Sequence, residues 1–198
     1  MNQMSQEPQV QDSQVEDAEA QSAASPATPE PRPRPAHPRF AKPQRVAFVQ
    51  SAWHREVVAE CRMAFLEEAE ARHIPRAAID VFEVPGSFEI PLHVQILAKT
   101  RRYTAIVAAG LVIDGGIYHE HISDTVIKAL MDVQLRTEVP VFSAILTSQQ
   151  FQETQAHFEF FKTHFATKGV EVAEACANTL LSLERLRGQV AAGIVASS

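Results

Sequence analysis

A histidine pair follows a glycine pair near the middle of the chain. Gly115 and Gly116 come directly after an apolar run, and His119 and His121 lie a few residues further on. Glycines let a backbone approach a ligand closely, and an imidazole can move protons near neutral pH. Backbone N–H groups at the start of a helix bind anions. These residues therefore suit proton transfer beside an anion, although a tight turn with surface histidines has the same pattern.

Two further residues with chemical potential lie earlier in the chain. Trp53 is the only tryptophan, and its indole either stacks on a flat heterocycle or covers the edge of the core. Glu89 lies between Gly86 and Pro91, in the first turn of a predicted helix. Its carboxylate there either offsets the helix dipole or accepts hydrogen bonds from a ligand. The residues alone leave both alternatives open.

Apolar runs alternate with helical patterns from residue 45 onward. The runs are rich in Val, Ile, Phe and Ala, which predicts buried parallel strands at 46–49, 78–84, 105–113 and 139–146. A helix should follow each of the first three strands, and two helices broken near Lys168-Gly169 should follow the fourth. This order predicts an α/β fold, a three-layer αβα sandwich around a four-stranded parallel sheet.

In such a sheet, ligands bind in a crevice outside the carboxyl ends of the strands. Trp53 follows the first predicted strand, residues 87–89 follow the second, and residues 114–121 follow the third. We therefore expect these three loops to share one crevice.

Residues 1–43 differ in composition from the remainder. They hold eight of the twelve prolines and few large apolar side chains, so they cannot bury enough surface to offset the entropy of ordering. We predict a disordered, Pro-rich tail over 1–43 and a folded domain over 44–190.

Composition also argues against several classes of protein. The net charge is −6, and no basic stripe suggests a general nucleic-acid binder. No apolar segment reaches the roughly 20 residues needed to cross a bilayer, and the N-terminus lacks a signal-like apolar stretch, so we expect a cytoplasmic protein without a membrane partner. Cys61 and Cys176 lack metal-ligand spacing and are predicted to be small core residues. No frame of further ligands surrounds His119 and His121, so we expect no metal.

Four ordered motifs over about residues 45–185 resemble the lumazine synthase family. They are VPGSFEIP at 84–91, VIDGGIYH at 112–119, VPV at 139–141 with Leu146-Thr147, and Lys168-Gly169. The second motif and the run 157–169 are similar to the second type of the family, found in some proteobacteria. The resemblance implies a flavodoxin-like fold and a homo-oligomer, either a pentamer or a dimer of pentamers.

The resemblance also implies a reaction. In it, 5-amino-6-(D-ribitylamino)uracil condenses with 3,4-dihydroxy-2-butanone 4-phosphate to 6,7-dimethyl-8-ribityllumazine, the penultimate step of riboflavin biosynthesis. Phosphate and water leave, and neither a metal nor an organic cofactor takes part.

The matching positions carry implied roles. Trp53 would stack on the pyrimidine, His119 would shuttle protons, and Lys168 would reach the substrates from an adjoining subunit. The other implied substrate contacts are Ser87, Phe88 and Glu89 near the ribityl chain, the backbone of Val112 and Ile113 at the pyrimidine edge, Gly115, Gly116 and Ile117 at the phosphate, and Ser143.

Three positions depart from the commonest family pattern. Ile117 replaces a usual Thr, Ser143 replaces a Phe that packs on the ring, and Phe160 replaces an Arg that holds the phosphate. Lys168 or His164 could hold the phosphate instead, and Lys168 is preferred. The departures leave one alternative function, a paralogue that binds flavin or lumazine with weak catalysis.

A phenylalanine-rich segment follows the fourth predicted strand. Exposed together, its rings would form a patch that monomers rarely tolerate. We expect them to face a neighbouring subunit, the alternative being that they fill the subunit's own core; they are Phe151, Phe158, Phe160, Phe161 and Phe165.

Overall fold

The computed structural model describes residues 36–113, 117–148 and 154–194, without the side chains of 117–120. The chain divides into two units, Met1–Pro35 and Ala36–Ser198. All the described helices and strands belong to the second unit.

Four parallel strands form one sheet in the order β2-β1-β3-β4. They are β1 (Val46–Ser51), β2 (Ile79–Val84), β3 (Ala105–Ile113) and β4 (Val141–Ser148). The two central strands, β1 and β3, are almost wholly buried because helices cover both of their faces. The predicted four-stranded parallel sheet is confirmed.

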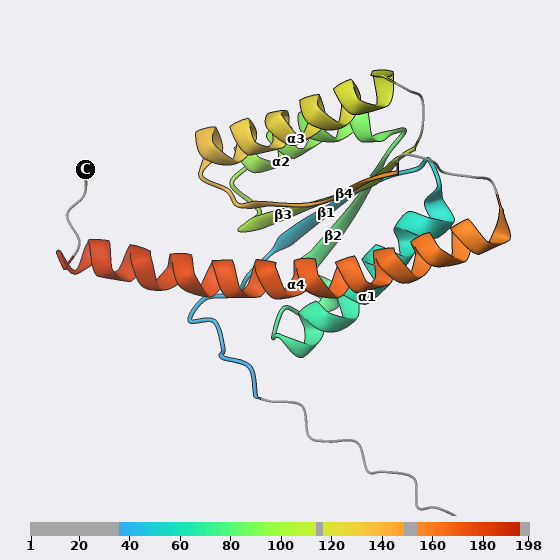
Figure 1. Cartoon of the computed structure of the whole chain (residues 1–198). Coiled ribbons are helices and arrows are strands. Elements are labelled where there is room, and N and C mark those ends of the chain that lie inside the picture. Colours follow the sequence, from blue (N-terminus) through green and yellow to red (C-terminus); the bar gives the residue numbers. More distant parts are fainter. Residues whose placement is uncertain (1–35, 114–116, 149–153, 195–198) are drawn as a thin grey trace, which may run out of the picture. The chain divides into compact units, whose positions relative to one another are not determined.

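Helices form the two outer layers (Figure 1). On one face lie α1 (Arg55–Ala71) and α4 (Gln155–Ala191), and on the other lie α2 (Ile90–Lys99) and α3 (Ile117–Thr137). Short 3₁₀ turns, η1 (Arg76–Ala78) and η2 (Ser87–Glu89), precede β2 and α2. All four long helices begin at the carboxyl edge of the sheet, which we define as the edge where the strands end.

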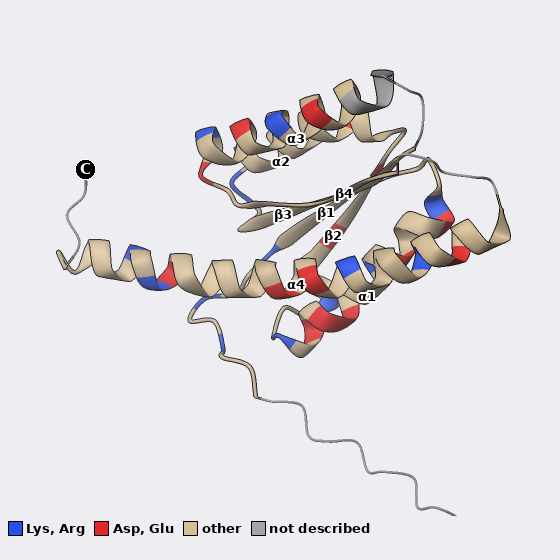
Figure 2. Ribbon diagram, viewed as in Figure 1, with Lys and Arg blue, Asp and Glu red and all other residues tan. Residues whose placement is uncertain are grey.

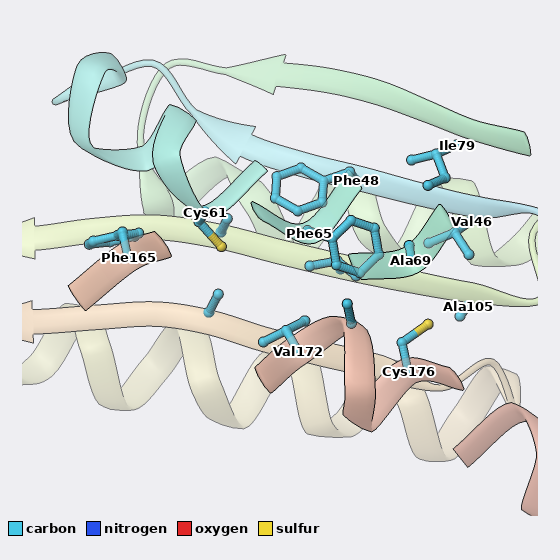
Figure 3. Close-up of a cluster of buried hydrophobic side chains, with 14 of the residues drawn as sticks. Val46, Phe48, Cys61, Phe65, Ala69, Ile79, Ala105, Phe165, Val172 and Cys176 are labelled. Carbon is cyan, nitrogen blue, oxygen red and sulfur yellow. The ribbon is translucent and has the colours of Figure 1, made fainter. Parts of the chain in front are cut away.

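Two apolar clusters hold the layers together, one on each face of the sheet. Figure 3 shows the cluster beneath α1 and α4, in which the rings of Phe48 and Phe65 lie 5.2 Å apart between centroids. Burying one such side chain stabilises the fold by about 1.5–3 kcal/mol. Cys61 and Cys176 are free thiols within this cluster, and burial raises the pKa of each to about 12. The prediction that both are core residues is confirmed.

The last helix differs from the prediction, because α4 runs unbroken through Lys168 and Gly169. A Cβ on Gly169 would lie 2.3 Å from the backbone oxygen of Cys61 in α1. The glycine therefore permits a close contact between two helices and does not end one. The predicted break near Lys168-Gly169 is wrong, because a glycine inside a helix has a packing role that spacing does not reveal.

The phenylalanine-rich segment also differs from the expectation. Phe161 and Phe165 are buried in the subunit's own core, and Phe158 packs against it. Phe160 alone among the described four is well exposed, at 63%. The expectation that the cluster faces a neighbour is wrong for Phe161 and Phe165, because their positions on α4 point toward the sheet; Phe151 lies outside the described residues.

Part of the predicted tail lies against the domain. Phe40 packs on the core beneath α1 and α4, and the backbone N–H groups of Ala41 and Lys42 both donate to the Glu184 carboxylate, at 3.2 Å each. Residues 36–43 thus contact the folded body, whereas residues 1–35 lie outside the described part.

Charged side chains of both signs alternate along α3 (Figure 2). Lys128 pairs with Asp124 and Arg136 with Asp132, each at 2.7 Å and four residues apart. Among the described helices, none is long and apolar enough to cross a membrane.

Candidate functional site

Backbone hydrogen bonds join the loop after β1 to the loop after β2. The N–H of Ala52 donates to the oxygen of Val84 at 2.7 Å, and the N–H of Trp53 donates to the oxygen of Pro85 at 3.2 Å. These bonds extend the β1–β2 pairing beyond the strands. His54 then adopts left-handed dihedral angles, φ 53° and ψ 44°, and turns the chain into α1. The backbone of Trp53 is therefore held at the carboxyl edge of the sheet.

The indole of Trp53 lies against the backbone of Gly86. A Cβ on Gly86 would approach the Cε3 and Cζ3 atoms of the ring to 3.3 Å. Trp53 is nevertheless 67% exposed. A large flat side chain in solvent at a strand end is suited to stack on a heterocycle.

The carboxylate of Glu89 is tied to the same glycine. Its Oε2 accepts a hydrogen bond from the N–H of Gly86 at 2.9 Å, while the N–H of Glu89 donates to the oxygen of Gly86 at 3.4 Å. The first bond is the carboxylate half of a capping box, and the second is the backbone hydrogen bond that closes η2. The carboxylate keeps further acceptor positions for the hydroxyl groups of a ligand.

The side chain of Ser87 points into the sheet. The residue is 4% exposed, and its Oγ has no hydrogen-bond partner among the described residues. A Cβ on Gly110 of β3 would lie 2.4 Å from that Oγ and 3.2 Å from the Oγ of Ser51. Gly110 therefore leaves space for the side chain of Ser87 in the loop after β2. In the sequence, the only sign of this role is a glycine within a run rich in Val and Ala.

The remaining described residues of this edge come from η2 and β3. Phe88 is 59% exposed beside Glu89. Val112 and Ile113 end β3, are half-buried, and pair with Thr147 and Ser148 of β4. Their backbone thus lies at the same edge as the loop that carries Trp53.

The loop predicted to bind the phosphate lies largely outside the described residues. Gly115 and Gly116 are in the undescribed segment between β3 and α3. Ile117 and His119 belong to the first turn of α3, but their side chains also lie outside the described part. The order of elements alone places them after the carboxyl end of β3.

Two predicted site residues lie away from the carboxyl edge of their own subunit. Ser143 is an exposed residue that pairs with Ala108 in the middle of β3, and its Oγ accepts from the N–H of Ile145 at 3.3 Å. Lys168 lies along α4, where its Nζ donates to Glu171 at 2.5 Å and its charge acts on the thiol of Cys61. A single subunit therefore does not bring these two side chains to Trp53.

His164, the other residue considered for the phosphate, stacks on an aromatic neighbour. Its ring lies 6.1 Å from that of Phe160 between centroids, at an interplanar angle of 7°. No group of three His, Cys, Asp or Glu side chains that could hold a metal occurs within the described ranges. The described part of the edge thus offers a ring, a carboxylate and backbone groups, which suits an aromatic heterocycle with a polyol chain.

Comparison with known proteins gives a consistent result. A family model described as 6,7-dimethyl-8-ribityllumazine synthase matches residues 43–184. A protein of Bradyrhizobium diazoefficiens named 6,7-dimethyl-8-ribityllumazine synthase 2 is 80% identical over 155 residues, which is 78% of this chain and 93% of that protein. A protein of the same name from Rhodopseudomonas palustris is 68% identical over 78% of this chain and 85% of its own length. A Caulobacter vibrioides protein named 6,7-dimethyl-8-ribityllumazine synthase 1 is 36% identical over 73% of this chain and 94% of its length.

Proposed function

Because the chain belongs to the 6,7-dimethyl-8-ribityllumazine synthase family, we propose that its two substrates condense at the carboxyl edge of the sheet, between the loops that follow β1, β2 and β3. The protein is a transferase of the second type of this family. It joins 5-amino-6-(D-ribitylamino)uracil to 3,4-dihydroxy-2-butanone 4-phosphate, and the product is 6,7-dimethyl-8-ribityllumazine.

One observation supports this location of the site. The exposed indole of Trp53 and the carboxylate of Glu89 both contact Gly86, so a ring-stacking group and a hydroxyl-binding group lie side by side. The pyrimidine substrate has the matching parts, a flat ring and a polyol chain. Trp53 stacks on its ring, and Glu89 accepts hydrogen bonds from its ribityl hydroxyls.

Backbone groups complete the pyrimidine subsite. Ser87 contributes through its backbone, since its hydroxyl points toward Gly110. Phe88 borders the ribityl chain with its exposed ring. The backbone N–H and C=O groups of Val112 and Ile113, at the end of β3, meet the polar edge of the pyrimidine.

The phosphate substrate binds where β3 passes into α3. Gly115, Gly116 and Ile117 line this subsite, because N–H groups at a helix start attract an anion. His119, in the first turn of α3, moves protons during imine formation, phosphate loss and ring closure, each of which needs a proton donor or acceptor.

The site is completed by a neighbouring copy of the chain. Lys168 and Ser143 lie away from the carboxyl edge of their own subunit, so in this proposal they reach the substrates of the next one. Lys168 then supplies the cation for the phosphate. In a cyclic assembly with a repeated head-to-tail interface, every subunit receives these two residues from one neighbour and gives its own to the other.

Exposed apolar stripes support such an assembly. Leu92 and Ile96 continue from Phe88 along α2 at four-residue spacing, and Ile127, Met131 and Leu135 do so along α3; these residues are between 42% and 70% exposed. The two helices pack side by side, so the stripes form a broad apolar surface that a monomer rarely tolerates. We propose a cytoplasmic pentamer, or a dimer of pentamers in which the exposed ring of Phe160 joins the second contact.

The test is an assay of product formation. We expect the purified protein to convert the two substrates to the lumazine, followed by absorbance, and we expect Trp53→Ala to raise the KM for the pyrimidine substrate. Binding of the product without any turnover would contradict the proposed function and favour a paralogue that only binds lumazine or flavin.

A further inference from the structure

We propose that Gly86 is a positioning residue that sets the separation between the Trp53 indole and the Glu89 carboxylate. The inference rests on the proposed function, in which these two side chains hold the pyrimidine substrate. Gly86 itself would not touch the reacting atoms.

The backbone of Gly86 does not require glycine. Its dihedral angles, φ −140° and ψ 178°, are those of an extended chain that any residue adopts. Conformational freedom therefore does not explain a glycine at this position.

The missing side chain is what matters at Gly86. A Cβ would lie 3.1 Å from the Oε2 of Glu89 and 3.3 Å from both Cε3 and Cζ3 of Trp53. The distances to the ring are shorter than the roughly 3.5–4.0 Å at which non-bonded carbon atoms pack best, and the distance to the carboxylate oxygen is shorter than a Cβ usually shows. A methyl group would therefore press on the carboxylate and the indole at the same time.

The two neighbours differ in their freedom to move. The Glu89 carboxylate is tied to the N–H of Gly86 at 2.9 Å, within a capping box that starts η2. The backbone of Trp53 is fixed to Pro85 at 3.2 Å, but its side chain is 67% exposed. The indole is hence the group that would yield, by a few tenths of an ångström.

The first experiment compares Gly86→Ala with Gly188→Ala in the whole protein. A Cβ on Gly188 of α4 would meet nothing within 4 Å, so this variant controls for the effect of replacing a glycine. We expect Gly86→Ala to raise the KM for the pyrimidine substrate by about three- to tenfold, since the indole must move by a few tenths of an ångström and a misplacement of 1 Å can cost about 10²-fold. The KM for the phosphate substrate and the melting temperature should change little, and the control should match the wild type in both KM values.

Fluorescence offers a readout that needs no turnover. Trp53 is the only tryptophan, so the emission of the substrate-free protein reports the surroundings of this indole alone. Gly86→Ala should shift the emission maximum toward that of a more solvated indole, whereas Gly188→Ala should leave it unchanged.

A double-mutant cycle then tests whether Gly86 acts through the indole. We expect Gly86→Ala to raise the KM for the pyrimidine substrate less in the Trp53→Phe background, because a smaller ring can accommodate the methyl group. If Gly86→Ala folds only in that background, the contact is supported as well. An equal increase in both backgrounds, or failure to fold in both, would overturn the proposal and leave a structural role.

Product formation by the wild type tests the proposed function, whereas the KM values and emission of Gly86→Ala test the role of the glycine. If the wild type makes product but Gly86→Ala has normal KM values and normal emission, Gly86 is not a positioning residue. If the wild type makes no product, the proposed function is wrong, while the emission of Gly86→Ala still decides whether the glycine places the indole.

Discussion

His119 and Glu89 have different tasks in the proposed site, so their replacement should change different kinetic constants. His119 moves protons and acts in the chemical steps, whereas Glu89 binds one of the two substrates and acts mainly in complex formation. Glu89 can be replaced without removing buried apolar atoms from the two clusters of the core.

For His119, we expect substitution by Ala to lower kcat by about 10²-fold or less. A general acid–base group contributes about 10²- to 10⁴-fold, and the condensation has appreciable reactivity of its own, which places the effect at the lower end. Single-turnover absorbance measurements at saturating substrates test this directly. Full turnover in the variant would mean that another group shuttles the protons.

For Glu89, we expect substitution by Gln to raise the KM for the pyrimidine substrate more than the KM for the phosphate substrate. The amide keeps an oxygen that can accept from the N–H of Gly86, now at 2.9 Å from Oε2, but it loses the charge that strengthens hydrogen bonds from the ribityl hydroxyls. Such bonds contribute about 1.5–3 kcal/mol each when one partner is charged. An equal rise in both KM values would contradict the assignment.

The close contact between α1 and α4 determines how two glycines of α4 affect stability. Gly169 and Gly188 both lie within α4, yet only Gly169 packs against another backbone. Identical substitutions should therefore change stability in opposite directions.

We expect Gly169→Ala to destabilise the protein and Gly188→Ala to stabilise it slightly. The added Cβ would lie 2.3 Å from the Cys61 oxygen at the first position and in open space at the second, where the gain in helix propensity is up to about 1 kcal/mol. Urea unfolding of the two variants beside the wild type measures both effects. A Gly169→Ala protein as stable as the wild type would show that α1 and α4 are free to move apart.

A polar cluster of Arg45, Asp80 and Tyr103 lies where β1, β2 and β3 begin, at the edge of the sheet opposite the proposed site. The Asp80 carboxylate accepts from the Tyr103 hydroxyl at 2.8 Å and from Nη2 of Arg45 at 2.7 Å. The hydrogen bond from Tyr103, followed by that from Arg45, lowers the pKa of Asp80. The contribution of this carboxylate to stability is consequently present above its ordinary pKa of about 3.9 and is lost as the pH falls through the lowered value.

We expect Tyr103→Phe, which removes one hydrogen bond to Asp80, to lower the free energy of unfolding at neutral pH. The decrease should become progressively smaller in acid. The loss should be about 1 kcal/mol and not more, because the Asp80 side chain is 30% exposed and solvent screens the interaction. Urea unfolding between pH 2 and pH 7 provides the comparison. A stability difference that stayed constant down to pH 2 would show that Asp80 does not respond to the hydroxyl.

The exposed apolar stripes on α2 and α3 can be changed to test assembly without disturbing the fold of the subunit. Leu92 and Met131 are 62% and 52% exposed in the subunit, so charged replacements there leave the core intact. Phe161 and Phe165 would be poor choices for the same test, because they lie in the core and their removal would unfold the subunit.

We expect Leu92→Asp combined with Met131→Asp to convert the assembly to folded but inactive subunits. Light scattering measures the mass, circular dichroism confirms the fold, and the lumazine assay measures activity. Met63→Asp, a change of the same kind at an exposed position of α1, serves as a control that should keep both mass and activity. A wild-type protein that is monomeric and active at high dilution would contradict the shared site.

Local pattern was sufficient to predict the four strands, their alternation with helices and the family. The predicted run 105–113 coincides with β3, because a strand buried on both faces needs a continuous apolar stretch that is visible in the sequence. The motif around Ser87 and Glu89 falls at the end of β2 as expected, since strand order in an α/β sheet places such loops at one edge.

The roles and burial of individual residues depended on contacts between segments that are far apart in the sequence. Gly169 resembles a helix break until Cys61, far away in the chain, is seen against it. Phe160 and Phe161 are neighbours in the sequence, but one is exposed and the other is buried. Helical spacing predicts that some residues are buried, but it does not say which partner approaches a given face, because close packing depends on shapes contributed by separate elements.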